Sequence, residues 1–412
     1  MFLITLISLW ILLLNNFLIH THYFMEKLRA KLLAFPAADL NTFSRGKKKL
    51  QSIFLPERVE YVDKDPEILV FLTGGSERIA LQSVSEHGFF LLLASKENNS
   101  WAAATEVKAW MNQNNVSSML LDYTSALTAE IIDNLFDVKN GLTRLKGQRF
   151  GLVGKASDWL VNSFIDPFII KTKLGIDQIN IPWTEINLES SGSIAPDFLA
   201  FFKGSCPNSL TDAGDIYEML LRVVSSYSLN ALTVECFSVI NRCNATACLA
   251  LSKLCMDGIA AGCEGDTCSL LGMMLAKELF GVVPWMANIN HVSTDELLFS
   301  HCTIPANLLQ DFSLGTHFET GKGLAIKGKI KANEVTIVRF DHTLSKIFIG
   351  VGRVVDIPYQ KTTCRTQLAV KVTPATSYYF SHNPLGNHHL IIPGNYVVGF
   401  DMVARMLRLA RV

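Results

Sequence analysis

The sequence carries no net charge, and the charge pattern of a nucleic-acid-binding protein is missing. Its 37 lysines and arginines are balanced by 37 aspartates and glutamates. A neutral balance provides no basic surface for phosphate groups, so we predict no nucleic-acid partner. The one basic run, at residues 45–49, is short and is typical of a solvated loop.

Phosphate-binding motifs are also absent. Gly154-Lys155 is followed by Ala156, and Arg149 stands where a P-loop needs its first glycine. No GxGxxG motif occurs. Gly74-Gly75 follows an apolar run at a position where α/β proteins bind ligands. The turn preference of glycine favours a plain tight turn there.

Cysteine spacing supports neither a structural zinc site nor a disulfide framework. The nine cysteines include no CxxC pair, and six of them lie between Cys236 and Cys268 in apolar sequence. A secreted disulfide scaffold would be short, with an even number of cysteines. We therefore interpret these cysteines as small buried apolar side chains of a cytoplasmic protein.

The first 24 residues do not match the rest of the chain. Residues 2–18 are apolar, but they lack the basic start and the cleavage site of a signal peptide and are slightly short for a membrane span. The sequence from Met25 is typical of a cytosolic N-terminus, so we predict that residues 1–24 are not part of the native chain and that no membrane is bound. The alternative is an N-terminal membrane anchor, and the basic residues that follow would then keep the body in the cytoplasm.

Length and composition indicate a folded chain of several domains. The 412 residues exceed what one core usually serves, and 49% hydrophobic with 18% charged residues is a globular composition. From about residue 65, apolar runs alternate with helical stretches, which predicts parallel sheets. Beyond residue 300 the strands become short and consecutive, which predicts antiparallel pairing in a small barrel or sandwich.

The predicted fold class is therefore α/β, with parallel-sheet layered α/β domains followed by an antiparallel β-rich C-terminal domain. After the segment 1–24, the predicted domains are 25–148, 149–300 and 301–412, the last with a closing helix at 397–409.

The densest group of reactive residues is Gly262-Cys-Glu-Gly-Asp266-Thr-Cys, which directly precedes helical sequence at 267–280. Asp266 is placed to cap that helix. Glu264 then lies on a glycine-flanked turn, where its carboxylate can face a cation. A capping turn with no further role explains the same residues.

Two later segments offer further ligands. His388 and His389 precede an apolar run, and adjacent side chains of an extended segment point to opposite sides, so one of them can face a site. Asn288 lies in an extended piece after the helix and is a weak oxygen ligand. A structural role fits each of these residues as well.

These residues carry a resemblance to the L-fucose isomerase and L-arabinose isomerase family. It rests first on Cys263-Glu-Gly-Asp266, Met286-Ala-Asn288 and Asn387-His388. Further segments resemble a fucose-isomerase-like branch of that family: Ser300-His-Cys-Thr-Ile-Pro305, Thr316-His-Phe-Glu-Thr-Gly321, Cys364-Arg-Thr-Gln367 and Asn383-Pro-Leu-Gly-Asn387.

The resemblance implies a divalent metal, typically Mn²⁺, held by Glu264, Asn288 and His388. It implies proton transfer between C1 and C2 of an open-chain monosaccharide through an enediol, with Glu264 catalytic, in an enzyme that builds its sites at subunit contacts of a homo-oligomer. Asn288 stands where L-fucose isomerase has a second acidic ligand, and an amide cannot carry the proton. Residues that could replace or support it are Asp266, His291, Asp295, His301, His317 and Glu319.

Two functions therefore stay open. The first is a metal-dependent aldose–ketose isomerase. The second is a non-catalytic sugar-binding or regulatory homologue, which the amide at Asn288 favours.

Overall fold

The computed structural model describes residues 25–85, 88–188, 195–202 and 207–412. The chain divides into two compact units, one ending at Asn140 and one running from Gly141 to Val412. The division falls inside α5 (Ala126–Leu145), and the domain boundaries expected after residues 148 and 300 stay predictions. Among the described residues, no helix is both long enough and apolar enough to cross a membrane. The segment 1–24 lies outside the described residues.

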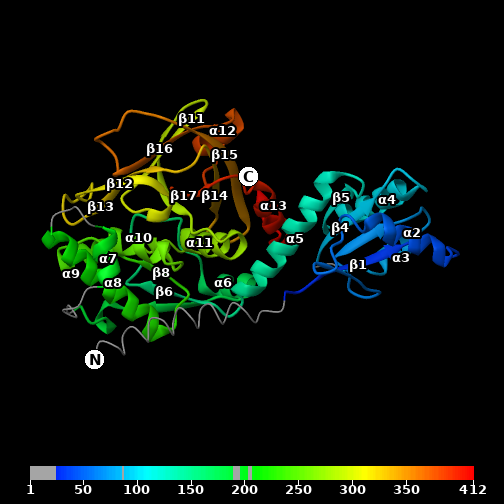
Figure 1. Ribbon diagram of the computed structural model, residues 1–412, viewed down its shortest axis with the longest axis horizontal. Coiled ribbons are helices and arrows are strands. Elements are labelled where there is room, and N and C mark those ends of the chain that lie inside the picture. The colour runs from blue at the N-terminus through cyan, green and yellow to red at the C-terminus, as the bar shows by residue number, and fades with distance from the viewer. Residues whose placement is uncertain (1–24, 86–87, 189–194, 203–206) are drawn as a thin grey trace. The chain divides into compact units, whose positions relative to one another are not determined.

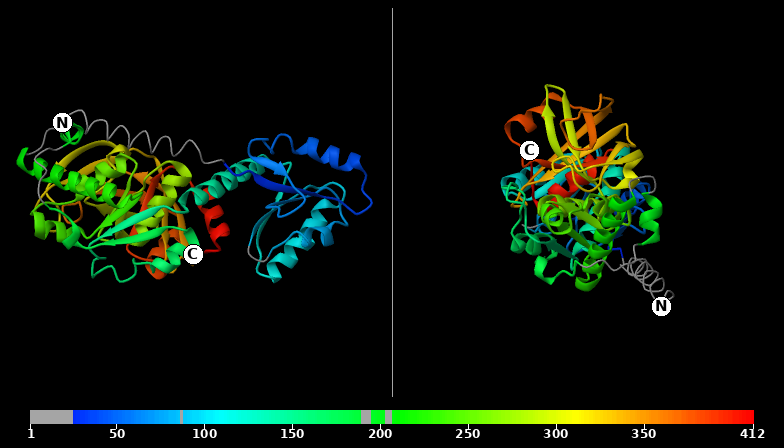
Figure 2. Two further views of the ribbon diagram at one scale, coloured as in Figure 1. Left: turned by 90° about the horizontal axis from the view of Figure 1, so that it is seen from below. Right: turned by 90° about the vertical axis from the view of Figure 1, so that its left-hand side faces the viewer.

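The first unit contains a five-stranded parallel sheet in the order β2-β1-β3-β4-β5. Its strands are β1 (Leu28–Leu33), β2 (Val59–Tyr61), β3 (Ile68–Phe71), β4 (Phe89–Ala94) and β5 (Ser117–Asp122). Its helices are α2 (Leu40–Leu50), α3 (Glu77–Leu81), α4 (Ser100–Gln113) and most of α5. Helices α2 and α4 cover opposite faces of this sheet (Figure 2), as right-handed crossovers require.

The second unit begins with a four-stranded parallel sheet in the order β7-β6-β8-β9. Its strands are β6 (Arg149–Val153), β7 (Asp177–Ile181), β8 (Ala231–Val234) and β9 (Ala260–Cys263). The connecting helices are α6 (Pro167–Leu174), η1 (Trp183–Glu185), α7 (Pro196–Phe201), α8 (Pro207–Tyr227), α9 (Cys236–Cys243), α10 (Cys248–Met256) and α11 (Thr267–Phe280). Both parallel sheets confirm the predicted fold class.

An antiparallel sheet follows and closes on itself. Six strands pair in the order β14-β17-β10-β11-β16-β15, and β15 pairs back to β14, so that they form a small barrel. They are β10 (Trp285–Val292), β11 (Glu296–His301), β14 (Glu334–Phe340), β15 (Lys346–Val355), β16 (Thr366–Lys371) and β17 (His388–Pro393). The remaining elements are η2 (Ala306–Leu308), the hairpin β12 (Leu309–Gly315) and β13 (Ala325–Ile330), α12 (Pro374–His382), α13 (Val397–Leu407) and β18 (Ala410–Arg411).

The antiparallel part starts earlier than the sequence pattern predicts. Strand β10 lies before residue 300, in the region that was expected to be parallel, but it pairs with β11 and β17 in the barrel. Its first residues, Trp285 to Ala287, are fully buried. A strand that is buried on both faces has the sequence pattern of a parallel strand, although both neighbours of β10 pair with it in the antiparallel direction.

Helix α11 joins the two sheets of the second unit. It packs against β8 and β9 on one side and against β14 and β17 on the other, and Figure 1 shows it between the green strands and the barrel. A Cβ atom at Gly272 would overlap the Leu390 side chain of β17, so glycine permits this close approach. The packing brings the end of β9 next to the barrel strands.

Candidate functional site

The site is built around the turn that links β9 to α11. Glu264 follows β9 directly and has a φ of +63°, and Gly265 has a φ of +70°. A positive φ is uncommon for a residue other than glycine and is often found at functional sites. At Gly265, an added Cβ would lie 2.6 Å from the Cα of Ala156, so this position requires glycine. The turn ends at Asp266, whose side chain accepts from the Ser269 N–H and caps α11 as predicted.

Two imidazole rings face the Glu264 carboxylate. Its Oε1 atom is 3.8 Å from Nε2 of His301 and 3.8 Å from Nε2 of His388, while its Oε2 atom accepts a 2.6 Å hydrogen bond from Trp159 Nε1. Both Nε2 atoms are buried, and neither has a hydrogen-bond partner in the described part of the chain. Buried polar atoms are nearly always paired. The spacing is too long for direct hydrogen bonds and fits a group held between the three side chains.

His388 is oriented by Asp266. Its Nδ1 atom lies 2.9 Å from Asp266 Oδ2, so Nδ1 carries the proton and the Nε2 lone pair points toward Glu264. A histidine that ligates a metal is typically held in this way by a carboxylate. His389 points to the other side of β17, where its Nε2 lies 3.0 Å from the Tyr379 hydroxyl. The two rings thus alternate as predicted.

Asp266 is itself held by a buried arginine. Arg339, on β14, places Nη1 3.2 Å from Asp266 Oδ2 and also donates to the backbone oxygen of His388. Burial alone would raise the pKa of Asp266, but Arg339 and the His388 hydrogen bond hold it below its usual value. The second nitrogen of Arg339 donates to Ser163 Oγ at 2.8 Å. This network fixes the position of His388 relative to the β9 turn.

His301 has the opposite arrangement of ring nitrogens. Its Nδ1 atom accepts a 3.3 Å hydrogen bond from the Thr303 N–H, so the neutral ring carries its proton on Nε2, the atom that faces Glu264. Burial, with His388 and His317 nearby, holds the pKa of His301 well below its usual value. His301 is therefore placed as a neutral hydrogen-bond donor, whereas His388 presents a lone pair.

Asn288 is close to these groups. It lies on β10 directly opposite His388 of β17, and its Oδ1 accepts a 2.6 Å hydrogen bond from Asn387 Nδ2. Asn288, Glu264 and His301 line one pocket. The position where an acid was expected is thus an amide held by a second amide.

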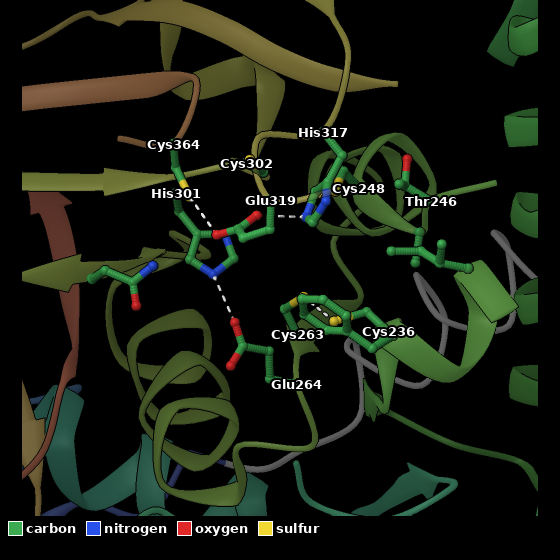
Figure 3. Close-up of a pocket in the computed structure, with 14 residues that line it drawn as sticks. Cys236, Thr246, Cys248, Cys263, Glu264, His301, Cys302, His317, Glu319 and Cys364 are labelled. Atoms are coloured by element: carbon green, nitrogen blue, oxygen red, sulfur yellow. Dashed lines mark hydrogen bonds and ion pairs between the residues drawn. The ribbon is translucent and has the colours of Figure 1, made fainter. Parts of the chain in front are cut away.

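The opposite wall of the pocket holds four more reactive side chains, from His317, Glu319, Cys302 and Cys364. Figure 3 shows Glu264 and His301 pointing toward each other, with these side chains grouped beside His301. The neighbouring Cys364 thiol and the backbone N–H groups of Arg365 and Phe318 lower the pKa of Cys302. The contact with Cys302 and burial raise that of Cys364.

Most of the residues singled out in the sequence converge here. The pocket brings together Glu264, Asn288, His301, His317 and Glu319, with Asp266 and His388 next to it. His291 and Asp295 are instead exposed, and neither lines the pocket. The sequence analysis did not single out Trp159 and Arg339, and it quoted Cys302 and Cys364 only within segments that carry the resemblance. Arg339 had a usable signal, because it is the single charge within the apolar run at 335–340.

Comparisons with known proteins show a distant similarity to sugar isomerases. The chain is 28% identical over 198 residues to sulfoquinovose isomerases of Priestia aryabhattai and Priestia megaterium, covering 45% of this chain and 44% of theirs. It is 27% identical over 158 residues to the sulfoquinovose isomerase of Alkalicoccus urumqiensis, covering 36% of each. No family model matches. The matched region thus spans less than half of these curated relatives, and the chain is distantly similar to a sugar isomerase.

Proposed function

We propose that this protein is a metal-dependent aldose–ketose isomerase that converts a monosaccharide through an enediol. One observation carries the proposal: the Glu264 carboxylate faces two buried imidazole nitrogens, each 3.8 Å away, that have no hydrogen-bond partner among the described residues. The distant similarity to sulfoquinovose isomerases supports the reaction class.

Glu264 and His388 are the proposed ligands of a divalent cation, with the Asn288 amide oxygen as a third. The donors fit such an ion, because the carboxylate is anionic and the His388 lone pair is directed by Asp266. Oxygen donors with one imidazole suit Mn²⁺, which is the cation we expect. When bound, it would polarise the oxygens on C1 and C2 of the open-chain sugar.

Proton transfer needs a group that can accept and return a proton. Asn288 cannot carry a proton, so we assign the transfer between C1 and C2 to the Glu264 carboxylate. His301 Nε2–H then donates to the sugar oxygen on which negative charge develops, because its other nitrogen is occupied by the Thr303 N–H. Glu319 and His317 line the far side of the pocket.

Deuterium exchange tests this reaction. Purified protein with Mn²⁺ is incubated in heavy water with a panel of free aldoses and ketoses that includes sulfoquinovose, and C2 deuteration is followed by NMR. We expect exchange on at least one sugar, and its loss in Glu264→Gln. Glu185→Gln is the matched control, because Glu185 is an exposed carboxylate that bonds Tyr227 outside the pocket. Exchange that persists in Glu264→Gln would contradict the assignment.

A non-catalytic sugar-binding protein is the second candidate. The observation that favours it is the amide at Asn288, which is already bonded to Asn387. The variant Asn288→Asp separates the two functions, since a carboxylate there restores a proton carrier. Sugar binding without deuterium exchange, in the wild type and in Asn288→Asp alike, would favour the binding function.

A further inference from the structure

A second group of metal-ligating side chains lies on the pocket wall opposite Glu264. Cys302, Glu319 and Cys364 each offer one donor atom, and these atoms all lie within 4.8 Å of one another. Cys302 follows β11, Cys364 precedes β16, and Glu319 lies between β12 and β13. The cluster thus joins three separate segments of the chain.

The two sulfur atoms are placed for metal binding. Cys302 and Cys364 are 2% and 6% exposed. The neighbouring backbone N–H groups of Arg365 and Phe318 help to lower the pKa of the Cys302 thiol. Donors of this kind stabilise a thiolate, which is the form that binds a metal. Cys364 Sγ donates to Glu319 Oε1 at 3.4 Å, so a carboxylate oxygen already lies next to the sulfur.

A histidine completes the set. His317 Nε2 lies 3.1 Å from Glu319 Oε2, and its Nδ1 lies 3.1 Å from the Thr320 hydroxyl. Nδ1 is thereby occupied, and Nε2 faces the Glu319 carboxylate. Two sulfurs and one carboxylate, with an imidazole beside the carboxylate, are donors of the kinds that tetrahedral zinc sites use. Glu319 is 43% exposed, which leaves a path for an ion to enter.

We propose that Cys302, Cys364, His317 and Glu319 form a second cation site, which takes zinc or a similar thiophilic divalent ion. Thiolate ligands select zinc over manganese, so this site differs in chemistry from the Glu264 site. Binding replaces the two thiol protons, which are released to solvent. The proposal does not depend on the isomerase reaction.

Cobalt titration tests the site directly. Co²⁺ replaces Zn²⁺ in tetrahedral sites, and cobalt–thiolate bonds give a near-ultraviolet charge-transfer band. We expect about one equivalent of Co²⁺ to produce this band and Zn²⁺ to remove it. Glu264→Gln should keep the band, whereas Cys302→Ser and Cys364→Ser should lose it. Cys243→Ser, a partly buried cysteine of α9 outside the pocket, is the matched control.

Glu319→Gln gives a milder test, because this partly exposed side chain can change without unfolding the protein. Loss of a residue that only supports a metal ligand typically lowers metal affinity about tenfold or more. We therefore expect the loss of a direct ligand to lower Co²⁺ affinity by at least about tenfold. The absence of a thiolate band, or a band that survives in both cysteine variants, would overturn the proposal. A Cys302–Cys364 disulfide found by mass spectrometry in protein purified under reductant would also overturn it.

Discussion

The two parallel sheets end very differently, although both consist of buried apolar strands. In the first unit, β3 runs into a turn whose polar groups satisfy each other: Thr73 Oγ1 accepts from the Phe35 N–H, and Ser76 Oγ donates to the Thr73 oxygen. In the second unit, β9 runs into Glu264, whose carboxylate faces two imidazole nitrogens that no group in the described part of the chain pairs with.

The difference shows that the parallel sheet of the second unit positions the Glu264 turn but does not supply the other groups of the site. Both imidazoles come from the barrel, His301 from the end of β11 and His388 from the start of β17. Helix α11 packs between β9 and the barrel strands and brings the two parts together. We infer that the chemistry depends on this packing, and each prediction below tests one part of that contrast.

The largest effect is expected on Mn²⁺ binding when a proposed ligand is replaced. Glu264→Gln removes the only anionic ligand of the proposed Mn²⁺ site, and hard divalent cations favour carboxylate oxygen. We expect most of the bound Mn²⁺ to be lost when retention is measured by elemental analysis after gel filtration. Retention equal to that of Glu185→Gln would show that the ion binds elsewhere.

The next effect is on stability. Arg339→Met leaves the Asp266 carboxylate buried without its cation, and breaking a buried pair typically costs about 3–5 kcal/mol. Urea denaturation should show a loss of that size. Lys171→Met, which breaks the exposed pair with Asp177, should cost less than about 1 kcal/mol. Equal losses in both variants would show that the buried network does not fix the site.

The variant His301→Gln tests whether His301 acts as a hydrogen-bond donor or as a metal ligand. Because His301 presents Nε2–H rather than a lone pair, Mn²⁺ retention should stay near the wild-type level. Deuterium exchange should fall by about a hundredfold, the lower end of what one positioned acid or base contributes. A parallel loss of Mn²⁺ would instead make His301 a ligand.

The smallest effect is expected in the first unit. Thr73→Val removes the hydroxyl that accepts from Phe35, which should cost about 0.5–1.5 kcal/mol. Mn²⁺ retention and exchange should not change. A loss of Mn²⁺ in this variant would break the contrast between the two sheets.

Local sequence was enough to predict part of this structure. The pattern placed a helix at 267–280 with Asp266 as its cap, and α11 has those bounds. It also predicted that His388 and His389 would point apart, because alternation along a strand is a local property. The family resemblance, rather than spacing, brought Glu264, Asn288 and His388 together in the prediction.

Long-range pairing could not be predicted. Strand β10 was predicted to be parallel because its first residues are buried on both faces, and its second partner, β17, lies about a hundred residues later in the sequence. Cys302 and Cys364 belong to no spacing motif, because the ladder between β11 and β16 brings them together. The role of Arg339 likewise depends on the packing of α11 against β14.

The most direct test of the central claim is an anomalous diffraction map of crystals soaked in Mn²⁺. The account predicts a manganese peak about 2.0–2.2 Å from a Glu264 carboxylate oxygen and His388 Nε2, the typical ligand distance for such atoms. A fully occupied peak that contacts neither residue, or no peak at saturating Mn²⁺, would contradict it.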